Sequence, residues 1–281
     1  VLVGRKSQGE KFPGAKTTMT VEAIMPDGKA LQMGTSHNLG QNFSKAFDVK
    51  FKGKDEKDYY VWQTSWGFST RLIGALIMVH GDNKGLVLPP AVSNEKLVIV
   101  PILFEDSKNK VMNEARSLAK KLEEFGVILD DREGYSPGWK FSEWEMKGIP
   151  LRIEIGPKDI EKKQVTLVRR DNGKKEQVPI GKINSLIEKV LKDMQADMLN
   201  SSKKFLNSRI DEAKDMKELI KKLKEGKIVR VYMKDDAKME KEIKDKTGGA
   251  TPRIIEDSKI SGKCIICGEQ VKTIGYIAKA Y

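Results

Sequence analysis

Two stretches near the start of the chain alternate between apolar and polar residues, a pattern typical of β-strands with one buried face. They are "TTMTVEAIM", residues 17–25, and "KALQMGT", residues 29–35. The turn-forming sequence Pro26-Asp27-Gly28 separates them. The pattern predicts a β-hairpin at this point. It also predicts a second return of the chain through "DYYVWQTSWGF", residues 58–68.

Two helices are predicted beside these strands. The segment "NLGQNFSKAF" begins at Asn38, a good N-cap, and spaces Phe43 and Phe47 on one helical face. Residues 70–80 are apolar on nearly every side, so this second helix is expected to be buried. Residues 1–95 are therefore predicted to form an antiparallel sheet that carries a buried helix.

The pattern changes after residue 90, where strands begin to alternate with helices. Apolar segments such as "KLVIVPILF" and "PLRIEI" are separated by helical ones, which predicts a mixed α/β domain over residues 96–195. A long helical stretch with mixed charges follows and leads into a small α/β module, together spanning residues 196–281. The predicted fold class is thus α/β (α+β), with three parts in sequence.

Composition narrows the kind of protein. Of the 281 residues, 33% are charged and 39% hydrophobic, a globular balance, and the longest apolar run is too short to cross a bilayer. We therefore expect no membrane association. Cys264 and Cys267 form a single C-x-x-C rather than a disulfide framework, which favours a reducing, cytoplasmic location. The net charge of +12 favours a polyanionic partner, because Lys and Arg gain affinity by releasing phosphate counterions. The alternative is a Lys-rich surface that is only solvated.

A candidate ligand surface surrounds Arg71. Arg71 occupies the first turn of the apolar helix, where the helix dipole disfavours a cation. In the preceding strand Gln32 and Gly34 should share one face, and Thr35 and His37 the other, unless a bulge intervenes. Small residues beside an Arg make a surface that a flat ring and a phosphate can both approach. A solvated Arg is the alternative.

Longer stretches carry a resemblance. They are "GRKSQGEKFPGA", "LQMGTSHNLGQNFSKAF", "QTSWGFSTRLIGALIMVHGDNKGLVLPP" and "SPGWKFSEWEMKGIPLRIEIGPKDI". In this order they resemble prolyl-tRNA synthetases of the archaeal and eukaryotic type, which are class II aminoacyl-tRNA synthetases. Together with weaker similarity the resemblance extends over essentially the whole chain. "SWGFSTRLIGALIMV" would be motif 3 of the class.

The resemblance implies ATP-dependent attachment of L-proline to its tRNA through a prolyl-adenylate, with ATP and Mg²⁺ as cofactors. It assigns Arg71 and Gln32 to catalysis. The ATP site would consist of Gln32, Thr35, Ser69 and Arg71, with Gln32 also near Mg²⁺. The proline pocket would consist of Phe12, His37, Ser65, Trp66 and Gly67.

The resemblance also assigns residues 96–195 to anticodon binding. "DDREGYSPGWKFSEWEMKG" interleaves basic and aromatic residues, a combination that suits unstacked RNA bases. The expected RNA contacts are Arg132, Lys140 and Glu145. Phe141 and Trp144, at helical spacing, are expected in the core.

The sequence departs from the family pattern in two places. Motifs 1 and 2 are missing, so the chain alone is expected to be incomplete and inactive, and a homodimer would form through the missing N-terminal region. Many relatives carry a four-cysteine zinc site, whereas only Cys264 and Cys267 occur here. Two thiols do not complete a tetrahedral site, so zinc is expected to be absent. The resemblance also places Tyr281 where it could brace the active site.

Two other functions stay open. One is a non-catalytic RNA-binding or scaffold protein derived from a synthetase, although the intact set of Gln32, Thr35, His37 and Arg71 argues against it. The other is a related synthetase such as the threonyl, seryl or glycyl enzyme. These share the fold but not the "TSHNLGQNFSK" sequence.

Overall fold

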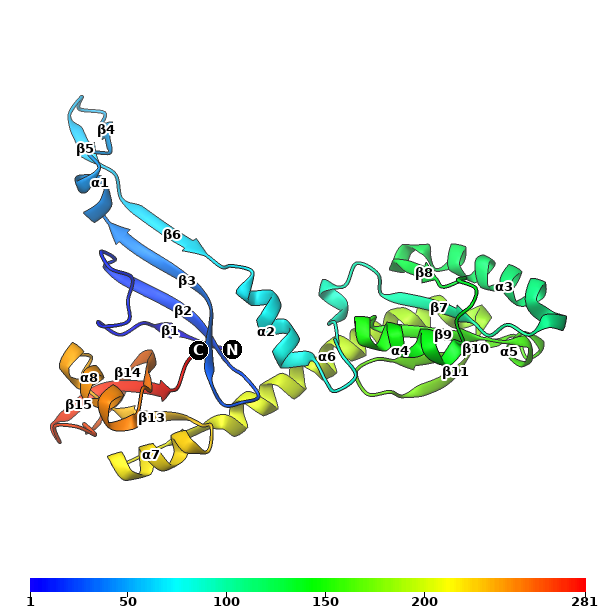
Figure 1. The fold of residues 1–281 in the computed structure, drawn as a ribbon. Coiled ribbons are helices and arrows are strands. Elements are labelled where there is room, and N and C mark those ends of the chain that lie inside the picture. Colours follow the sequence, from blue (N-terminus) through cyan, green and yellow to red (C-terminus); the bar gives the residue numbers. More distant parts are fainter. The chain divides into compact units, whose positions relative to one another are not determined.

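The computed structural model describes all residues 1–281 and divides into two compact units. One unit combines residues 1–75 with residues 203–281, and the other comprises residues 76–202 (Figure 1). These units differ from the predicted division at 95 and 195, because strands from both ends of the chain enter one sheet. No helix combines the length and apolar character needed to cross a membrane.

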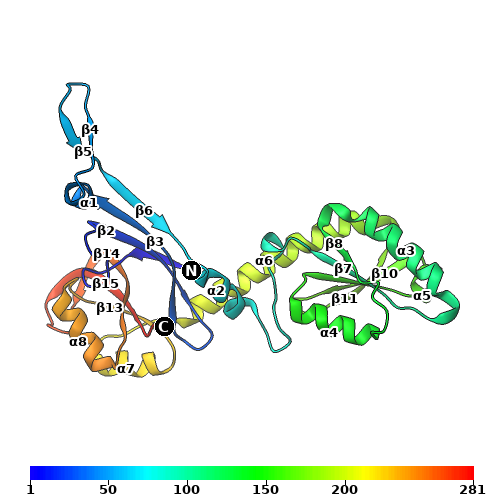
Figure 2. The same ribbon diagram turned by 45° about the horizontal axis from the view of Figure 1, so that its top comes forward.

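The first unit contains an eight-stranded sheet (Figures 1 and 2). Its strand order is β12-β13-β15-β14-β1-β2-β3-β6. Only β12 and β13 are parallel, and every other neighbouring pair is antiparallel. The strands are β1 (Leu2–Arg5), β2 (Thr17–Ile24), β3 (Ala30–Gly40), β6 (Gln63–Gly67), β12 (Ile210–Glu212), β13 (Ile228–Tyr232), β14 (Thr251–Lys263) and β15 (Gln270–Ala278).

The predicted hairpin is confirmed as the antiparallel pair β2 and β3. Gly28 closes its turn with a φ of 83°, a left-handed conformation that glycine adopts without strain. The second return of the chain also occurs, through β4 (Lys50–Lys52) and β5 (Asp58–Tyr60) into β6. Figures 1 and 2 show the β4–β5 hairpin projecting beyond the eight-stranded sheet.

The prediction of a helix N-cap at Asn38 is wrong. Asn38 lies in β3, where its side-chain oxygen accepts from the N–H of Gly40 at 3.0 Å. The strand continues to Gly40 because it pairs with β6, an interaction that local sequence does not reveal. The helix α1 is shorter, Asn42–Ala46.

The prediction of a buried second helix is also wrong. The helix α2, Arg71–His80, buries only Ala75, and Ile73 is 62% exposed. Ile77 and Met78 are also exposed, and Leu72, Leu76 and Val79 are only partly buried. An apolar pattern indicates a helix that needs a partner, but it does not supply one.

The C-terminal helices α7 (Met216–Lys224) and α8 (Ala237–Thr247) pack on the sheet of the first unit. Leu219 and Leu223 of α7 and Ile243 of α8 join apolar residues of β13, β14 and β15 in one buried cluster. Both helices begin at an Asp whose side chain accepts a backbone N–H, at Asp215 and Asp236, as expected for an N-cap.

The second unit is a mixed α/β domain, in agreement with the predicted fold class. Its sheet has the order β11-β10-β9-β7-β8, in which β7 is parallel to β8 and β9. Helices α3 and α6 supply the core on one face, and α4 packs on the other (Figure 2). The elements are β7 (Leu97–Pro101), α3 (Lys108–Lys121), β8 (Val127–Leu129), α4 (Pro137–Lys147), β9 (Leu151–Ile155), α5 (Pro157–Glu161), β10 (Gln164–Arg169), β11 (Lys175–Pro179) and α6 (Ile183–Arg209).

An ion pair holds the loop after α2 inside this second unit. The Arg170 guanidinium donates two hydrogen bonds to the Asp82 carboxylate, at 2.7 and 2.6 Å. These bonds, opposed by a small cost of burial, lower the pKa of Asp82 from 3.8 to about 2. Arg170 also donates to the carbonyl of Glu145 at 2.7 Å, so the loop is connected to α4.

Replacing Asp82 should therefore have a pH-dependent effect on stability. A depressed folded pKa means that the ionised carboxylate contributes its full stability above pH 3.8 and loses it as the pH falls toward 2. Asp82→Asn is expected to cost about 1 kcal/mol near pH 7, a figure reduced for solvent screening. In urea unfolding, the difference in the free energy of unfolding between Asp82→Asn and the unmodified chain should narrow below about pH 4. A gap of constant size across that range, or an equal effect of Asp193→Asn, would contradict this.

Candidate functional site

A β-bulge in β3 gathers the predicted nucleotide residues on one face of the first unit's sheet. Thr20 lies opposite Thr35, but Glu22 lies opposite Gln32, which leaves an extra residue, Met33, in β3. Residues directly opposite each other in an antiparallel pair point to the same face, and Thr20 and Glu22 share a face. The side chains of Gln32 and Thr35 therefore lie on the same face of the sheet. Strict alternation would have placed them on opposite faces, and the bulge changes this.

The edge strand β6 extends this face. Ser65 lies opposite His37, and Gly67 lies opposite Thr35. Trp66 alternates with them and lies opposite Ser36, which gives its side chain to the other face of the sheet. The structure therefore brings Ser65 and Gly67 to His37, as predicted, and separates the indole of Trp66 from them.

His37 is fixed by two threonine hydroxyls. Its Nδ1 lies 2.9 Å from Thr18 Oγ1, and its Nε2 lies 3.0 Å from Thr35 Oγ1. A hydroxyl can donate or accept, so either neutral tautomer of the imidazole is satisfied by this pair. The arrangement orients the ring, as a binding residue requires, and leaves no carboxylate beside it.

The Phe12 ring packs against His37. The two ring centroids are 4.9 Å apart with an interplanar angle of 44°. Phe12 lies in the loop between β1 and β2, and its backbone N–H donates to Thr18 Oγ1 at 3.1 Å. One hydroxyl thus locates both aromatic residues of the predicted proline pocket.

Arg71 is the first residue of α2 and is exposed. Its guanidinium donates to the carbonyl oxygen of Gln32 at 3.3 Å and forms no ion pair. The Ser69 hydroxyl accepts from the Arg71 backbone N–H at 3.3 Å, which begins the helix. The free cation is thus positioned at the edge of the face that carries Gln32 and Thr35.

These residues line one open hollow with a volume of about 400 Å³. Its lining comprises Gln32, Met33, Gly34, Thr35, His37, Ser65, Trp66, Gly67, Phe68, Ser69 and Arg71. The donors and acceptors that it offers are amide, hydroxyl, imidazole and guanidinium groups, without a carboxylate. Such a lining can accept a polyanion, and it brings all the predicted ATP-site residues together.

A buried charge cluster lies on the same strand face as the site. The Glu22 carboxylate is 1% exposed, accepts from Lys6 Nζ and Thr20 Oγ1 at 2.8 Å, and accepts from Arg253 Nε at 3.1 Å. Burial lowers the pKa of Lys6, while the Glu22 charge opposes that shift. Sequence reasoning missed this cluster, although the alternation of Thr18, Thr20 and Glu22 shows that one face of β2 is polar.

A second candidate site lies around Asp130 in the other unit. Burial disfavours its charge, but hydrogen bonds from Arg132 and Trp144 and the charge of Lys140 hold the pKa of the carboxyl well below its usual range. Lys140, an expected RNA contact, is buried and donates to the Asp130 carbonyl at 3.0 Å. Its charge therefore lies inside the unit, because it balances Asp130.

Two exposed rings stack beside this cluster. Tyr135 and Trp139 have centroids 4.2 Å apart and an interplanar angle of 22°. The Arg132 guanidinium lies 5.3 and 5.4 Å from their centroids and also binds Asp130 and Glu143. Stacked aromatic rings next to a cation form a surface suited to a flat base. Trp144 and Phe141 pack toward the core, as predicted.

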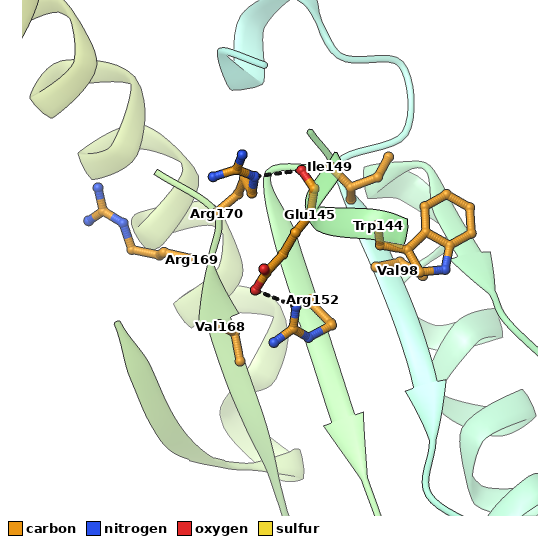
Figure 3. Close-up of a pocket in the computed structure, with 8 residues that line it drawn as sticks. All are labelled: Val98, Trp144, Glu145, Ile149, Arg152, Val168, Arg169 and Arg170. Carbon is orange, nitrogen blue, oxygen red and sulfur yellow. Dashed lines mark hydrogen bonds and ion pairs between the residues drawn. The ribbon is translucent and has the colours of Figure 1, made fainter. Parts of the chain in front are cut away.

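Glu145, the third expected RNA contact, belongs to an internal network (Figure 3). Its carboxylate accepts from Arg152 at 3.2 Å and pairs with Lys84 at 3.4 Å. The small cavity beside it has a volume of about 10 Å³, too small for a nucleotide. The structure thus engages the Glu145 carboxylate within its own unit.

The C-x-x-C turn lies between β14 and β15. Burial disfavours ionisation of Cys264, but backbone N–H groups of Cys267 and Ile266 lower the pKa of its thiol overall. No group of three or more His, Cys, Asp or Glu residues is placed to hold a metal. These two thiols therefore do not fit a four-ligand zinc site. Tyr281 lies at the β2–β3 turn, where its ring is under Lys29 Nζ at 4.9 Å.

The double role of Thr18 can be tested by Thr18→Val, which keeps the volume of the side chain. Thr18 is 2% exposed, so its loss leaves the Phe12 N–H and one His37 nitrogen without their partner. We expect a loss of about 1–2 kcal/mol in the free energy of unfolding, measured with urea. Thr64→Val, at an exposed position of β6, is the control. Equal losses in the two variants would show that Thr18 is not a specific anchor.

Comparisons with known proteins match two parts of the chain to families. Residues 96–190 match the family described as "Anticodon binding domain", and residues 216–281 match "Prolyl-tRNA synthetase, C-terminal". The first corresponds to most of the second compact unit, and the second to the module that contains α7, α8 and the C-terminal strands.

Whole-chain similarity extends to proline–tRNA ligases. That of Oceanobacillus iheyensis is 47% identical over 100% of this chain and 59% of its own length. That of Natranaerobius thermophilus is 49% identical over 95% of this chain and 56% of its own length, and that of the archaeon Cenarchaeum symbiosum is 44% identical over 100% and 60%. The chain therefore spans about three fifths of the length of these curated relatives.

Proposed function

Because this chain belongs to the prolyl-tRNA synthetase family, we propose that it is part of an enzyme that attaches L-proline to its tRNA at the expense of ATP. The observation that carries the proposal is the single face on which Gln32, Thr35 and His37 meet, with the unpaired cation of Arg71 at its edge. A surface with these groups suits an amino acid joined to a nucleotide.

In this proposal Arg71 binds the phosphates of ATP. A guanidinium that has no carboxylate partner keeps its donors for a phosphate, which it can bind with two hydrogen bonds. Gln32 and Thr35 contact the nucleotide from β3, and Ser69 does so from the start of α2. Mg²⁺ would neutralise phosphate charge. Gln32 could give it an amide oxygen, while the phosphates would supply most other ligands because the hollow lacks carboxylates.

Proline would bind against the packed rings of Phe12 and His37, along the strand that carries Ser65 and Gly67. A pyrrolidine ring is compact and apolar, so an aromatic wall that is held rigidly suits it. Because the indole of Trp66 belongs to the other face, the backbone of this segment rather than its ring would form the floor. The His37 ring, which two hydroxyl partners hold in place, would orient the ligand.

The proposed reaction has two steps. A carboxylate oxygen of proline attacks the α-phosphorus of ATP, which forms prolyl-adenylate and releases pyrophosphate. A ribose hydroxyl of the terminal tRNA adenosine then attacks the acyl carbon, which forms the ester, releases AMP and gives up its proton. Neither step needs a covalent enzyme intermediate, so the residues here contribute by positioning and by charge stabilisation.

The second compact unit would bind the anticodon of the tRNA. We base this on the stacked rings of Tyr135 and Trp139 rather than on the three residues expected from the sequence. Lys140 and Glu145 are engaged within the unit. Arg132 also binds Asp130 and Glu143, but its side chain is exposed and lies beside the rings, where it can approach a base together with them. Unstacked loop bases are commonly bound by such rings.

Two further parts of the proposal concern assembly and metal content. The active form would be a homodimer that uses a region N-terminal to this chain, and the module at residues 216–281 would fold without zinc. The latter rests on the unsuitable donor set of Cys264 and Cys267. Metal analysis of purified protein tests it, and about one zinc per chain would contradict it.

The activity is tested with the full-length gene product by amino-acid-dependent exchange of pyrophosphate into ATP, with each of the 20 amino acids in turn. Stimulation by proline supports the proposal. Stimulation by threonine, serine or glycine instead would assign a related synthetase. Binding of tRNA without any exchange would favour a non-catalytic RNA-binding protein.

The role of Arg71 is tested by Arg71→Ala in that assay. We expect a loss of about 10²–10³-fold in kcat/KM, because a group that stabilises developing phosphate charge is removed. Arg71→Lys should recover only part of the activity, since an ammonium cannot bind a phosphate through a planar fork. Arg116→Ala removes an exposed Arg from α3 and is the control. An Arg71→Ala enzyme as active as the control would contradict the assignment.

The stacked rings are tested by Trp139→Ala in a tRNA-binding titration. Loss of a base-stacking ring should weaken binding about tenfold. The slope against salt should stay unchanged, because no phosphate contact is removed. Phe104→Ala removes another exposed ring from the same unit and serves as the control. If both variants bind alike, the rings do not contact RNA.

A further inference from the structure

The loop that carries Phe12 is held by two carboxylates of the C-terminal module. The backbone N–H of Gln8 donates to Asp235 Oδ1 at 2.8 Å, and that of Gly9 donates to Glu240 Oε1 at 3.0 Å. Asp235 precedes α8, and Glu240 lies in its first turn. The loop and α8 are more than 220 residues apart in sequence, yet they belong to one compact unit.

Glu240 is a buried part of this contact. Its side chain is buried, and burial raises the pKa of its carboxyl, while the bonds from Gly9 and Ser7 oppose that shift. A Cβ atom added to Gly9 would overlap Oε2 of Glu240. A side chain at position 9 would therefore require the Glu240 carboxylate to move.

Two arginines extend the contact. Arg5 pairs with Asp235, and Arg253 lies 3.5 Å from the Glu10 carboxylate while it also binds the buried Glu22. The C-terminal module thus contacts Gln8, Gly9 and Glu10 in succession. Buried carboxylates with several donors are costly to move, because any shift leaves a charge without its partners.

The far end of the same loop packs against His37, which lines the ligand hollow. Within the loop, the N–H of Lys11 donates to the Ser7 carbonyl, and the N–H of Glu10 donates to the Ser7 hydroxyl. Beyond them Phe12 binds Thr18 and packs against His37. Asp235 and Glu240 thus anchor from outside the loop the backbone of residues that precede Phe12, while Arg253 contacts the Glu10 side chain.

We propose that Asp235 and Glu240 are positioning residues that set the place of the Phe12 ring and thereby the affinity of the amino-acid pocket. The inference rests on the proposed function for its ligand, proline. It gives the C-terminal module a role in substrate binding, although the module contributes no residue to the lining of the hollow.

The proposal makes a selective prediction. Gln32, Thr35 and Arg71 lie on β3 and α2 and receive no contact from Asp235 or Glu240. Loosening the loop should thus weaken proline binding and leave ATP binding unchanged. A general loss of stability would instead affect both ligands together.

The first experiment measures pyrophosphate exchange by the full-length gene product. Glu240→Ala is expected to raise the KM for proline about tenfold, because a charged hydrogen bond to the loop is lost, and to change the KM for ATP by less than about twofold. Glu240→Gln, which keeps an acceptor oxygen, should recover most of the affinity.

Two control variants come from the same helix. Glu242→Ala removes a partly exposed carboxylate that pairs with Lys246, and Ile243→Ala removes a buried core side chain without touching the loop. Below its unfolding temperature Ile243→Ala should keep a normal KM for proline. An equal rise in that variant, or parallel rises in both KM values for Glu240→Ala, would overturn the proposal.

A second experiment does not depend on the substrate. Hydrogen exchange of the full-length protein should be about tenfold faster at residues 8–12 in Glu240→Ala and in Asp235→Ala, and unchanged in β3. Unchanged protection of residues 8–12 would overturn the proposal. If the unmodified protein activates no amino acid, the proposed function fails. Hydrogen exchange alone then decides whether the two carboxylates order the loop.

Discussion

The buried carboxylate of Glu22 is the interaction on which the first unit depends. A charge that is 1% exposed is tolerated only when it is paired, and Glu22 receives Lys6 from the end of β1 and Arg253 from β14. The direct pairing of β1 with β14 is limited to Arg5 and Ile255, and these ion pairs join the two ends of the chain together with the buried apolar cluster of Ile24, Ala30, Ile228 and Ala278. They lie on the strand face that continues into the ligand hollow, and they link the stability of the site to the C-terminal module.

Local sequence predicted the elements better than their connections. Alternation identified β2 and β3, and strand–helix alternation identified the second unit, because both patterns are short in range. The joining of residues 1–75 and 203–281 in one sheet depends on pairs more than 200 residues apart, which no periodicity reports. The apolar pattern of α2 predicted a buried helix, but in this chain only Ala75 of α2 is buried.

The candidate site shows the same limit at the scale of single side chains. Strict alternation would separate Gln32 from Thr35, and only the pairing of Glu22 with Gln32 reveals that Met33 forms a bulge. The family resemblance named residues that the fold then gathers in one hollow, but it could not show that Trp66 alternates away or that Lys140 balances a buried carboxylate. Tyr135 was missed because its value arises from stacking on Trp139, four residues further along the chain and inside α4.

A sheet face, a loop held by the C-terminal module and an exposed aromatic pair are all assigned to one proposed reaction. In this reaction the amino acid and the nucleotide meet on the face of β3. The most direct measurement is a crystal structure of the full-length protein with a non-hydrolysable analogue of prolyl-adenylate. We expect the pyrrolidine ring against the packed rings of Phe12 and His37, and the nucleotide beside Gln32 and Thr35 within reach of Arg71. An analogue bound away from this face would contradict it.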